Sequence, residues 1–364
     1  MMRIPCTIAA VFLLALLAGQ ACADVERQQE ENLVPIAFSA VVSGDMPLTR
    51  AAHEIGDDAT LQANGFGVFA CYTGLHKYSE SDANASFMYD QKVEWSAANS
   101  HWVYEPLKYW PNGEGEATSV TGENPHYVSF FAYAPYSDGS NPCIPSFSRF
   151  GEQTNAWLMY RLAENVEDQV DLLYADPLLD CTKPAVDEKL CFVFKHALAC
   201  VGEDVKLDCS DALVSSLKAE IDAGGGDQID YYLKSMKIKY VLTGKGRMTL
   251  WNKGTANWAP IQSEDVLVTR SVILFSGQTA FFHYKSGDSS VTVTPWTDHG
   301  HGVFCIPAEA PGYPQKAVVE MEYKIRRVKG SEIIEADRSV SSELLLKGFI
   351  QEGKTLDINI TLSN

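Results

Sequence analysis

GFGVFACYTG, at residues 65–74, opens a run of four aromatic segments that decides the fold. FMYDQKVEW at 87–95, WVYEPLKYWPN at 102–112 and VSFFAYAPY at 128–136 follow it. Each segment is rich in aromatic and β-branched residues and is bounded by glycine, proline, asparagine or serine, which is typical of strands between turns. The run therefore predicts consecutive strands of a β-rich domain.

Alternation within the second segment predicts how its strand is placed. Asp90, Lys92 and Glu94 fall on one face, while Val93 and Trp95 fall on the other. Side chains point to opposite faces along a strand, so this pattern predicts one face in water and one against a core.

The second half of the chain alternates in the same way. LCFVFKHALACV at 190–201, MKIKYVLTG at 236–244, AVVEMEYKI at 317–325 and TLDINITLSN at 355–364 read as strands. In the first of these, His196 lies on the apolar face and is expected to be a hydrogen-bonded core histidine. Only 210–224 looks helical, with Ser210 as N-cap. Many strands and little helix predict an all-β protein built of β-sandwiches.

The length of 364 residues is sufficient for two domains. A short polar linker containing Pro184 is expected within 180–189. The predicted organisation is a signal peptide at 1–21, a flexible tether at 22–33, an N-terminal β-sandwich at 34–185 and a C-terminal β-sandwich at 186–364.

The leader has two readings at its end. A charged start and the apolar run at 7–19 are typical of a secretory signal peptide. Ala21-Cys22-Ala23 fits ordinary signal peptidase, whereas Gly19-Gln20-Ala21 before Cys22 is similar to a bacterial lipoprotein signal, although leucine usually stands at the place of Gly19. We expect lipidation at Cys22, because acidic residues follow it closely; a plain secreted form is the alternative.

Composition argues against several classes of function. The formal charge of −18 repels phosphate backbones, so no nucleic acid partner is expected. The sequence has no G-x-S-x-G elbow, H-E-x-x-H motif or P-loop. We therefore expect no enzyme, no catalytic residue and no cofactor.

Three residue groups invite a site but have plainer readings. Asp298-His299-Gly300-His301 is the most metal-like cluster, yet no further ligand pattern surrounds it, so no metal site is expected. The seven cysteines from Cys71 to Cys305 lack a C-x-x-C pair and suggest buried thiols, with one or two disulfides at 181–209. A set of aromatics could stack on sugars but is more typical of a sandwich core: Tyr104, Tyr109, Trp110, Tyr133 and Tyr136.

The order of the aromatic words also carries a family resemblance. GFGVFACYTG, MYDQKVEW, YEPLKYWPN and SFFAYAPY resemble the N-terminal domain of the fimbrillin-like (Mfa-like) family of Bacteroides-type surface proteins. FKHALACV, KIKYVLTGKGRMTLWNKGTANW and EGKTLDINITL extend the resemblance over nearly the whole mature chain. The chain departs most at Gly202, Glu203 and Asp204, which interrupt a strand that is usually smoother.

The resemblance implies both a fold and a function. It implies two tandem transthyretin-like β-sandwich domains and a structural or accessory subunit, such as a tip subunit, of a cell-surface fimbria that supports adhesion. It implies export as a lipoprotein held to the outer membrane through Cys22, cleavage between Arg50 and Ala51 by an Arg-specific protease, and polymerisation with other fimbrial subunits by donor-strand exchange.

Physical reasoning assigns residues to that exchange. Cleavage at Arg50 would free the first strand, exposing a groove that a neighbour's strand could refill. The displaced strand carries Ile36, Phe38, Ala40 and Val42 on one face. The C-terminal segment is a candidate donor through Leu356, Ile358, Ile360 and Leu362, or else an ordinary core strand. The alternative function is a surface lipoprotein that binds a glycan or host ligand without polymerising.

Overall fold

The structure is a computed structural model that describes residues 34–43, 55–79, 83–111, 126–184, 188–251, 254, 256–260, 267–308 and 314–363. The expected signal peptide, Cys22, Arg50 and Ala51 lie outside these residues. Within them, no helix has the length and apolar character needed to cross a membrane.

The first half of the chain is organised around an eight-stranded sheet. Its strands run in the order β1-β10-β8-β5-β2-β3-β4, with β9 beside β5. The bounds are β1 Phe38–Val42, β2 Phe66–Gly74, β3 Met88–Ser96, β4 His101–Val103, β5 Tyr127–Ala134, β8 Leu173–Ala175, β9 Leu178–Cys181 and β10 Leu190–His196.

Three further sheets complete the fold, which is all-β as predicted. Their orders are β14-β13-β7-β6, then β17-β11-β18 with β21 beside β11, and β16-β15-β12-β19-β20. The bounds are β6 Ser146–Phe147, β7 Trp157–Arg161, β11 Ala199–Cys209, β12 Gln228–Thr243, β13 Lys245–Thr249, β14 Asn257–Pro260, β15 Leu267–Lys285, β16 Thr292–Val293, β17 Trp296–His299, β18 Val303–Cys305, β19 Lys316–Lys329, β20 Glu332–Leu345 and β21 Thr355–Leu362.

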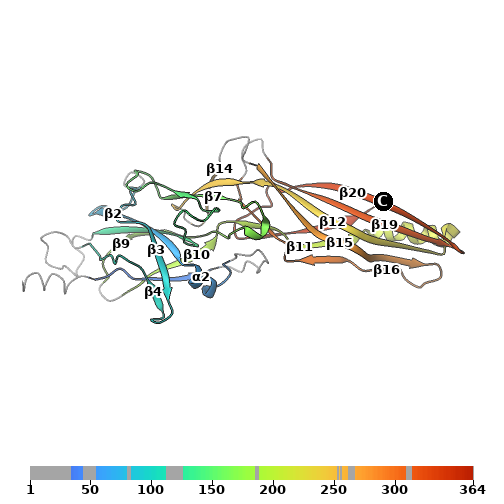
Figure 1. Ribbon diagram of the computed structural model, residues 1–364, viewed down its shortest axis with the longest axis horizontal. Helices are drawn as coiled ribbons and strands as arrows, with labels where there is room; N and C mark the ends of the chain where they lie inside the picture. The colour runs from blue at the N-terminus through green and yellow to red at the C-terminus, as the bar shows by residue number, and fades with distance from the viewer. Residues whose placement is uncertain are drawn as a thin grey trace, which may run out of the picture.

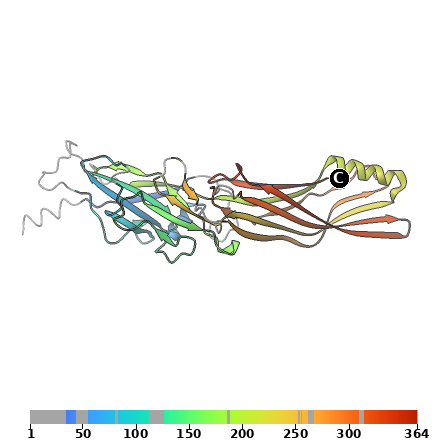
Figure 2. The same cartoon turned by 90° about the horizontal axis from the view of Figure 1, so that it is seen from above.

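The molecule is elongated, with its two halves end to end (Figures 1 and 2). The sheet that holds β2, β3 and β10 occupies one end, and the long strands β12, β15, β19 and β20 extend to the other (Figure 1). The helical elements are α2 Asp58–Asn64, η2 Val166–Asp168, α3 Asp211–Glu220 and η3 Ile221–Gly225.

The sheets cross the expected domain boundary at residue 185. Strand β10 lies beyond that point, yet it pairs with β1 and β8 of the first sheet. Strand β13 also comes from the second half, and it pairs with β7. Independent folding of 34–185 and 186–364 therefore stays a prediction, while the strands themselves interlock the two halves.

Two of the aromatic segments form strands that are buried on both faces. Alternate residues of β2 and β5 belong to two different clusters: Phe66 and Phe130 to one, Phe69 and Phe131 to the other. We call the first cluster the outer core; it is confined to residues between Ile36 and Phe194. The second, the shared core, continues through the junction to Leu362 in the second half.

The other two segments differ from each other. In β3, Lys92 and Glu94 are exposed, Val93 is fully buried and Trp95 packs against the outer core, as predicted. Asp90 departs from the predicted wet face, because its side chain is partly buried and accepts a hydrogen bond from the Tyr133 hydroxyl. The segment 102–112 was expected to be a strand, but only its first residues continue β4. Pro106 has no N–H for a ladder, and the chain beyond it runs as irregular backbone.

The second half follows the predicted alternation closely. Met236, Ile238, Tyr240 and Leu242 of β12 are all fully buried. Helix α3 begins where predicted, since the Ser210 side chain accepts a hydrogen bond from the Leu213 N–H.

Two expectations for the second half need correction. The single strand expected over 190–201 is in fact β10 followed by β11, because the chain passes from one sheet to another at Ala197 and Leu198. The disulfides expected at 181–209 are not formed, since none of the described cysteines is joined to another by a disulfide. Cys181 lies on β9, Cys191 on β10, and Cys200 and Cys209 on β11, so the strands hold them in different places.

Tyr133 joins β5 to β2 and β3 at the centre of the first sheet. A Cβ atom on Gly67 would lie 2.2 Å from Cε1 of the Tyr133 ring, so only glycine leaves room for that ring. The Tyr133 hydroxyl donates a 2.6 Å hydrogen bond to Oδ1 of Asp90 and contacts the Ser137 carbonyl oxygen at 3.0 Å. Burial raises the pKa of Asp90 to about 6.

Replacing Gly67 by alanine is expected to lower stability by ~1–3 kcal/mol or more, because the added methyl group overlaps the buried Tyr133 ring. Denaturant unfolding monitored by circular dichroism measures the change. The matched control is Gly277→Ala on β15, where the new Cβ atom meets only the Phe275 side chain, at 3.3 Å. Equal stability of the Gly67→Ala variant and the parent would contradict this packing.

The raised pKa of Asp90 makes stability depend on pH. The unfolded chain loses this proton near pH 3.8 and the folded chain near pH 6. The stabilising contribution is therefore complete below pH 3.8 and is lost as the pH rises towards 6, at about 1.4 kcal/mol per unit of pKa difference. Asp90→Asn keeps an acceptor for Tyr133, so it should remove this dependence and be more stable than the parent at pH 7.

Urea unfolding of both proteins between pH 3.5 and 7.5 measures this difference. Glu94→Gln, at an exposed carboxylate on the same strand, is the control and should keep the parent profile. An Asp90→Asn profile parallel to that of the parent would show that Asp90 does not titrate in this range.

Candidate functional site around the first strand

Strand β1 lies at the end of the first sheet and covers the outer core. It pairs in parallel with β10, from Phe38 opposite Leu190 to Val42 opposite Phe194. Ile36 and Phe38 are 1% and 2% exposed. Ala40 and Val42 are partly buried and pack against the same core. All four side chains predicted for a displaced strand therefore contact the outer core, and their displacement itself stays a prediction.

Phe38 is the residue of β1 with the most aromatic contacts. Its ring centroid lies 5.4 Å from Tyr104, 5.6 Å from Phe192, 5.9 Å from Phe130 and 6.4 Å from Phe66. These rings come from the 104–110 segment, β10, β5 and β2. Removing β1 would expose an aromatic cavity, which would cost several kcal/mol for a residue of this size.

The irregular segment after β4 holds the start of the first strand from its other side. The Ile36 N–H donates to the Lys108 carbonyl oxygen, and the Trp110 N–H donates to the Val34 carbonyl oxygen, each at 2.9 Å. The Tyr104 hydroxyl donates to the Ile36 carbonyl oxygen at 2.8 Å. The residues before β1 are thus bracketed by backbone hydrogen bonds.

Helix α2 holds the end of the strand. The Val42 N–H donates to Oδ1 of Asp58 at 2.8 Å. Asp58 is the first residue of α2, where the helix dipole favours a carboxylate. Sequence patterns did not predict this helix, since only 210–224 looked helical. Its signal was Asp57 as N-cap and Gly65 after the last turn, and the Asp57 side chain accepts the Thr60 N–H at 2.7 Å.

A buried hydrogen bond between a histidine and a carboxylate lies behind the same region. Nδ1 of His196 lies 2.7 Å from Oδ2 of Asp171, and both side chains are at most 2% exposed. The same Asp171 oxygen accepts the Ile55 N–H at 3.4 Å. The prediction of a hydrogen-bonded core histidine is confirmed. This pair ties the chain that enters α2 to β10, the strand that β1 covers.

Strand β21, the candidate donor, occupies a place in its own half. It pairs in parallel with β11 from Cys200 opposite Thr355 to Cys209 opposite Leu362, across a bulge between Val201 and Val205. Ile358 and Leu362 are buried, and Leu356 and Ile360 pack against the shared core. The bulge falls at Gly202 to Asp204, where the sequence departs from the family pattern.

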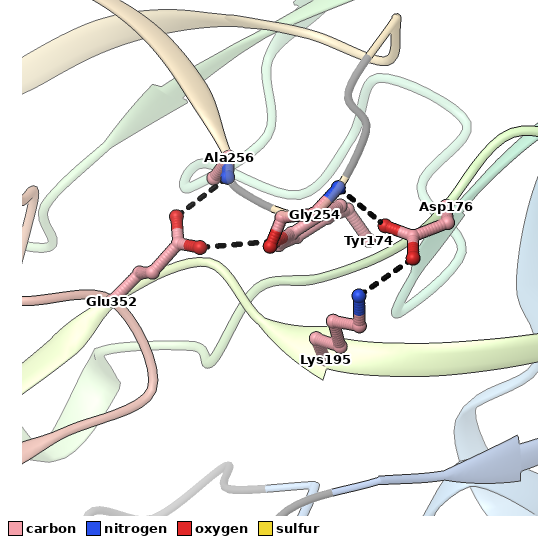
Figure 3. Close-up of polar contacts among 6 residues, drawn as sticks. All are labelled: Tyr174, Asp176, Lys195, Gly254, Ala256 and Glu352. Atoms are coloured by element: carbon pink, nitrogen blue, oxygen red, sulfur yellow. Dashed lines mark hydrogen bonds and ion pairs between the residues drawn. The ribbon is translucent and has the colours of Figure 1, made fainter.

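Glu352 fixes the turn that leads into β21 (Figure 3). Its carboxylate accepts the Tyr174 hydroxyl at 3.0 Å and the Ala256 N–H at 2.5 Å. Asp176 beside it accepts the Gly254 N–H at 3.1 Å and contacts Nζ of Lys195 at 2.7 Å. The turn before the candidate donor is therefore fastened to β8 of the first sheet and to Ala256, just before β14.

The other groups singled out in the sequence do not assemble into a site. His299 pairs with Asp204 at 2.5 Å and His301 with Asp298 at 2.6 Å, and the described residues include no set of three groups placed to hold a metal ion. Of the five candidate stacking aromatics, three are buried in the two cores and Tyr109 is 40% exposed.

The solved structures give a counterpart for this architecture. A fimbrial protein from Bacteroides vulgatus aligns over 91% of this chain and 96% of its own length, with 18% identity and a TM-score of 0.55. The chain shares the fold of that fimbrial protein. This fimbrial fold is consistent with the resemblance to the fimbrillin-like family, and no family model and no curated protein matches the chain.

Two more distant structures have related names. A fimbrial protein from Bacteroides ovatus aligns over 90% of this chain and 48% of its own length, with 11% identity and a TM-score of 0.31. A provisionally named cell adhesion protein from Parabacteroides distasonis aligns over 91% and 92%, with 9% identity and a TM-score of 0.41.

Loss of the Asp58 carboxylate is expected to loosen the end of β1 without unfolding the fimbrial fold. An Asp58→Ala variant should raise hydrogen exchange at the Val42 amide about fivefold, which corresponds to ~1 kcal/mol for the lost hydrogen bond. Exchange read by NMR gives the measurement. Asp58→Asn retains an acceptor oxygen and should remain close to the parent, and unchanged exchange in Asp58→Ala would show that this contact does not hold the strand.

Proposed function

We propose that the protein is a structural or accessory subunit of a cell-surface fimbria and assembles by exchange of its first strand. The observation that carries this proposal is the position of β1: an edge strand whose side chains fill one face of the outer core and whose chain continues into the segment containing Arg50. The shared fold with a fimbrial protein supports it. The role is non-enzymatic and uses no cofactor.

Release of β1 would leave a groove of defined shape. Its floor would be the rings that surround Phe38. One wall would be the free edge of β10, and the other would present the Lys108 carbonyl oxygen, the Trp110 N–H and the Tyr104 hydroxyl. A strand with alternating apolar side chains from another subunit would restore both the backbone hydrogen bonds and the burial. The shared core lies on the other face of the sheet, so it would remain covered.

Cleavage supplies the trigger in this proposal. Arg50 is the only lysine or arginine between Arg27 and Lys77, so an Arg-specific protease has one target in this part of the chain. The cut before Ala51 would separate β1 from α2. Asp58 and Ile55 would stay with the rest of the cleaved chain, which we call the body. Lipid on Cys22 would hold the uncut precursor at the outer membrane, as expected for a surface lipoprotein.

The contacts in the structure define the acceptor groove more closely than they define the donor strand. Strand β21 could act in another subunit only by leaving β11, which would expose Ile358 and Leu362 and break the Glu352 contacts. Its four apolar residues, from Leu356 to Leu362, keep the spacing that the groove requires. We therefore retain β21 as the candidate donor, with an ordinary structural strand as the other reading.

Cleavage and refilling can be tested together. Purified precursor treated with an Arg-specific protease should give a body beginning at Ala51 by mass spectrometry, and the body should form a ladder of oligomers. Arg50→Ala should stay intact and give no ladder of oligomers. A synthetic peptide of residues 34–42 in excess should suppress the ladder, because it refills the groove.

The matched peptide, with aspartate in place of Phe38, should suppress much less, since a carboxylate is costly in the aromatic groove. A body that begins at Ala51 and remains a stable monomer without any peptide would contradict the exchange mechanism. That outcome would favour a non-polymerising surface protein that binds a glycan or host ligand.

A further inference from the structure

Strand β20 forms one long margin of the second half (Figure 1). It pairs with β19 over fourteen residues without a register shift, from Lys316 opposite Leu345 to Lys329 opposite Glu332. Its other edge has no partner strand among the described residues. Every residue except Ala336 is exposed. The strand therefore presents a long, regular row of backbone donors and acceptors.

The margins of the other sheets are shorter. The opposite margin of the same sheet is β16, which has two residues, and the remaining edges include β4 with three, β6 with two and β14 with four. Natural sheets avoid unwanted pairing through short edges, bulges, prolines and charged side chains. Strand β20 is long and has no bulge or proline. It carries five charged side chains, and three of them are paired with lysines of β12 and β19.

Four exposed apolar residues of β20 are placed symmetrically about Ser339, while the fifth, Val340, would face Arg338 of the second strand. Ile333 and Ile334 lie at one end, and Leu344 and Leu345 lie at the same distances on the other side; these four are between 38% and 56% exposed. A two-fold axis through Ser339 would place Ile333 opposite Leu345 of a second strand and Ile334 opposite Leu344. Such self-complementarity is what an isologous interface requires.

The alternation of side chains between the two faces of a strand supports the same register. Directly opposed residues of an antiparallel pair point to the same face, so a two-fold axis perpendicular to the sheet must pass through a residue position. Axes at Asp337 or Arg338 would oppose like charges at the centre. The axis at Ser339 opposes two small hydroxyl side chains there.

The acidic side chains of β20 are largely neutralised within each chain. Glu335 pairs with Lys324 at 2.8 Å, and Glu343 pairs with Lys316 at 2.7 Å. In the Ser339 register Glu335 would face Glu343 of the other copy, and each already carries its own lysine. Asp337 likewise pairs with Lys234 at 3.0 Å. The charges thus permit the register that the apolar residues favour.

We propose that β20 is a self-association surface: two copies of this chain pair through it, antiparallel, about a two-fold axis at Ser339. The two five-stranded sheets become one continuous sheet, and the first halves point away from each other. This contact lies at the opposite end of the molecule from β1 and is independent of strand exchange.

Cross-linking tests the register. In a chain carrying Cys22→Ser and Cys191→Ser, Ser339→Cys would place one new thiol of each copy beside the two-fold axis. The two Cα atoms would lie about 5 Å apart, which is within the range that a disulfide spans. Copper phenanthroline should then give a covalent dimer. The matched control is Ser341→Cys, also exposed and on the same face, where the two Cα atoms would lie about 14 Å apart. It should not cross-link.

Sedimentation velocity tests the association without cysteines. Self-association of the uncleaved chain should strengthen as salt rises, because each copy carries a formal charge of −18. Ile334→Lys should weaken it at least tenfold, and Ile273→Lys, at a 67% exposed residue of β15 away from the edge, should not. A monomer at all concentrations, or equal cross-linking of both cysteine variants, would overturn the proposal.

Discussion

The fold depends on two central strands of the first sheet that are buried on both faces. Along β2 and β5, one set of alternating side chains packs into the outer core and the other into the shared core. Such strands have no face available for water, which is why both read as nearly continuous apolar runs. Close packing at Gly67 and Tyr133 holds β2 and β5 at the distance this arrangement needs.

The outer core and the shared core differ in which parts of the molecule they hold together. The outer core lies on one face of the first sheet, including β10, and is covered at its edge by β1, so one strand controls its exposure. The shared core joins both halves and contains no residue of β1. A change at the first strand can therefore alter one face of the sheet while the packing that unites the two halves persists.

Sequence patterns predicted the strands whose surroundings are periodic and missed those decided by distant contacts. Alternation gave β3, β12, β19 and β21, and the apolar face of β1. It could not separate β10 from β11, because Ala197 and Leu198 are both fully buried and nothing local marks the change of sheet. The contacts of Asp58 with Val42 and of Glu352 with Tyr174 join residues 16 and 178 positions apart, which periodicity does not encode.

The direct succession of β10 and β11 also has a mechanical consequence. These strands follow one another through the junction, and each has a parallel neighbour, β1 and β21. A pull along the long axis would load these pairs in shear, so that many backbone hydrogen bonds resist together instead of opening one after another. The junction can thereby transmit tension between the ends of the molecule without opening one hydrogen bond at a time.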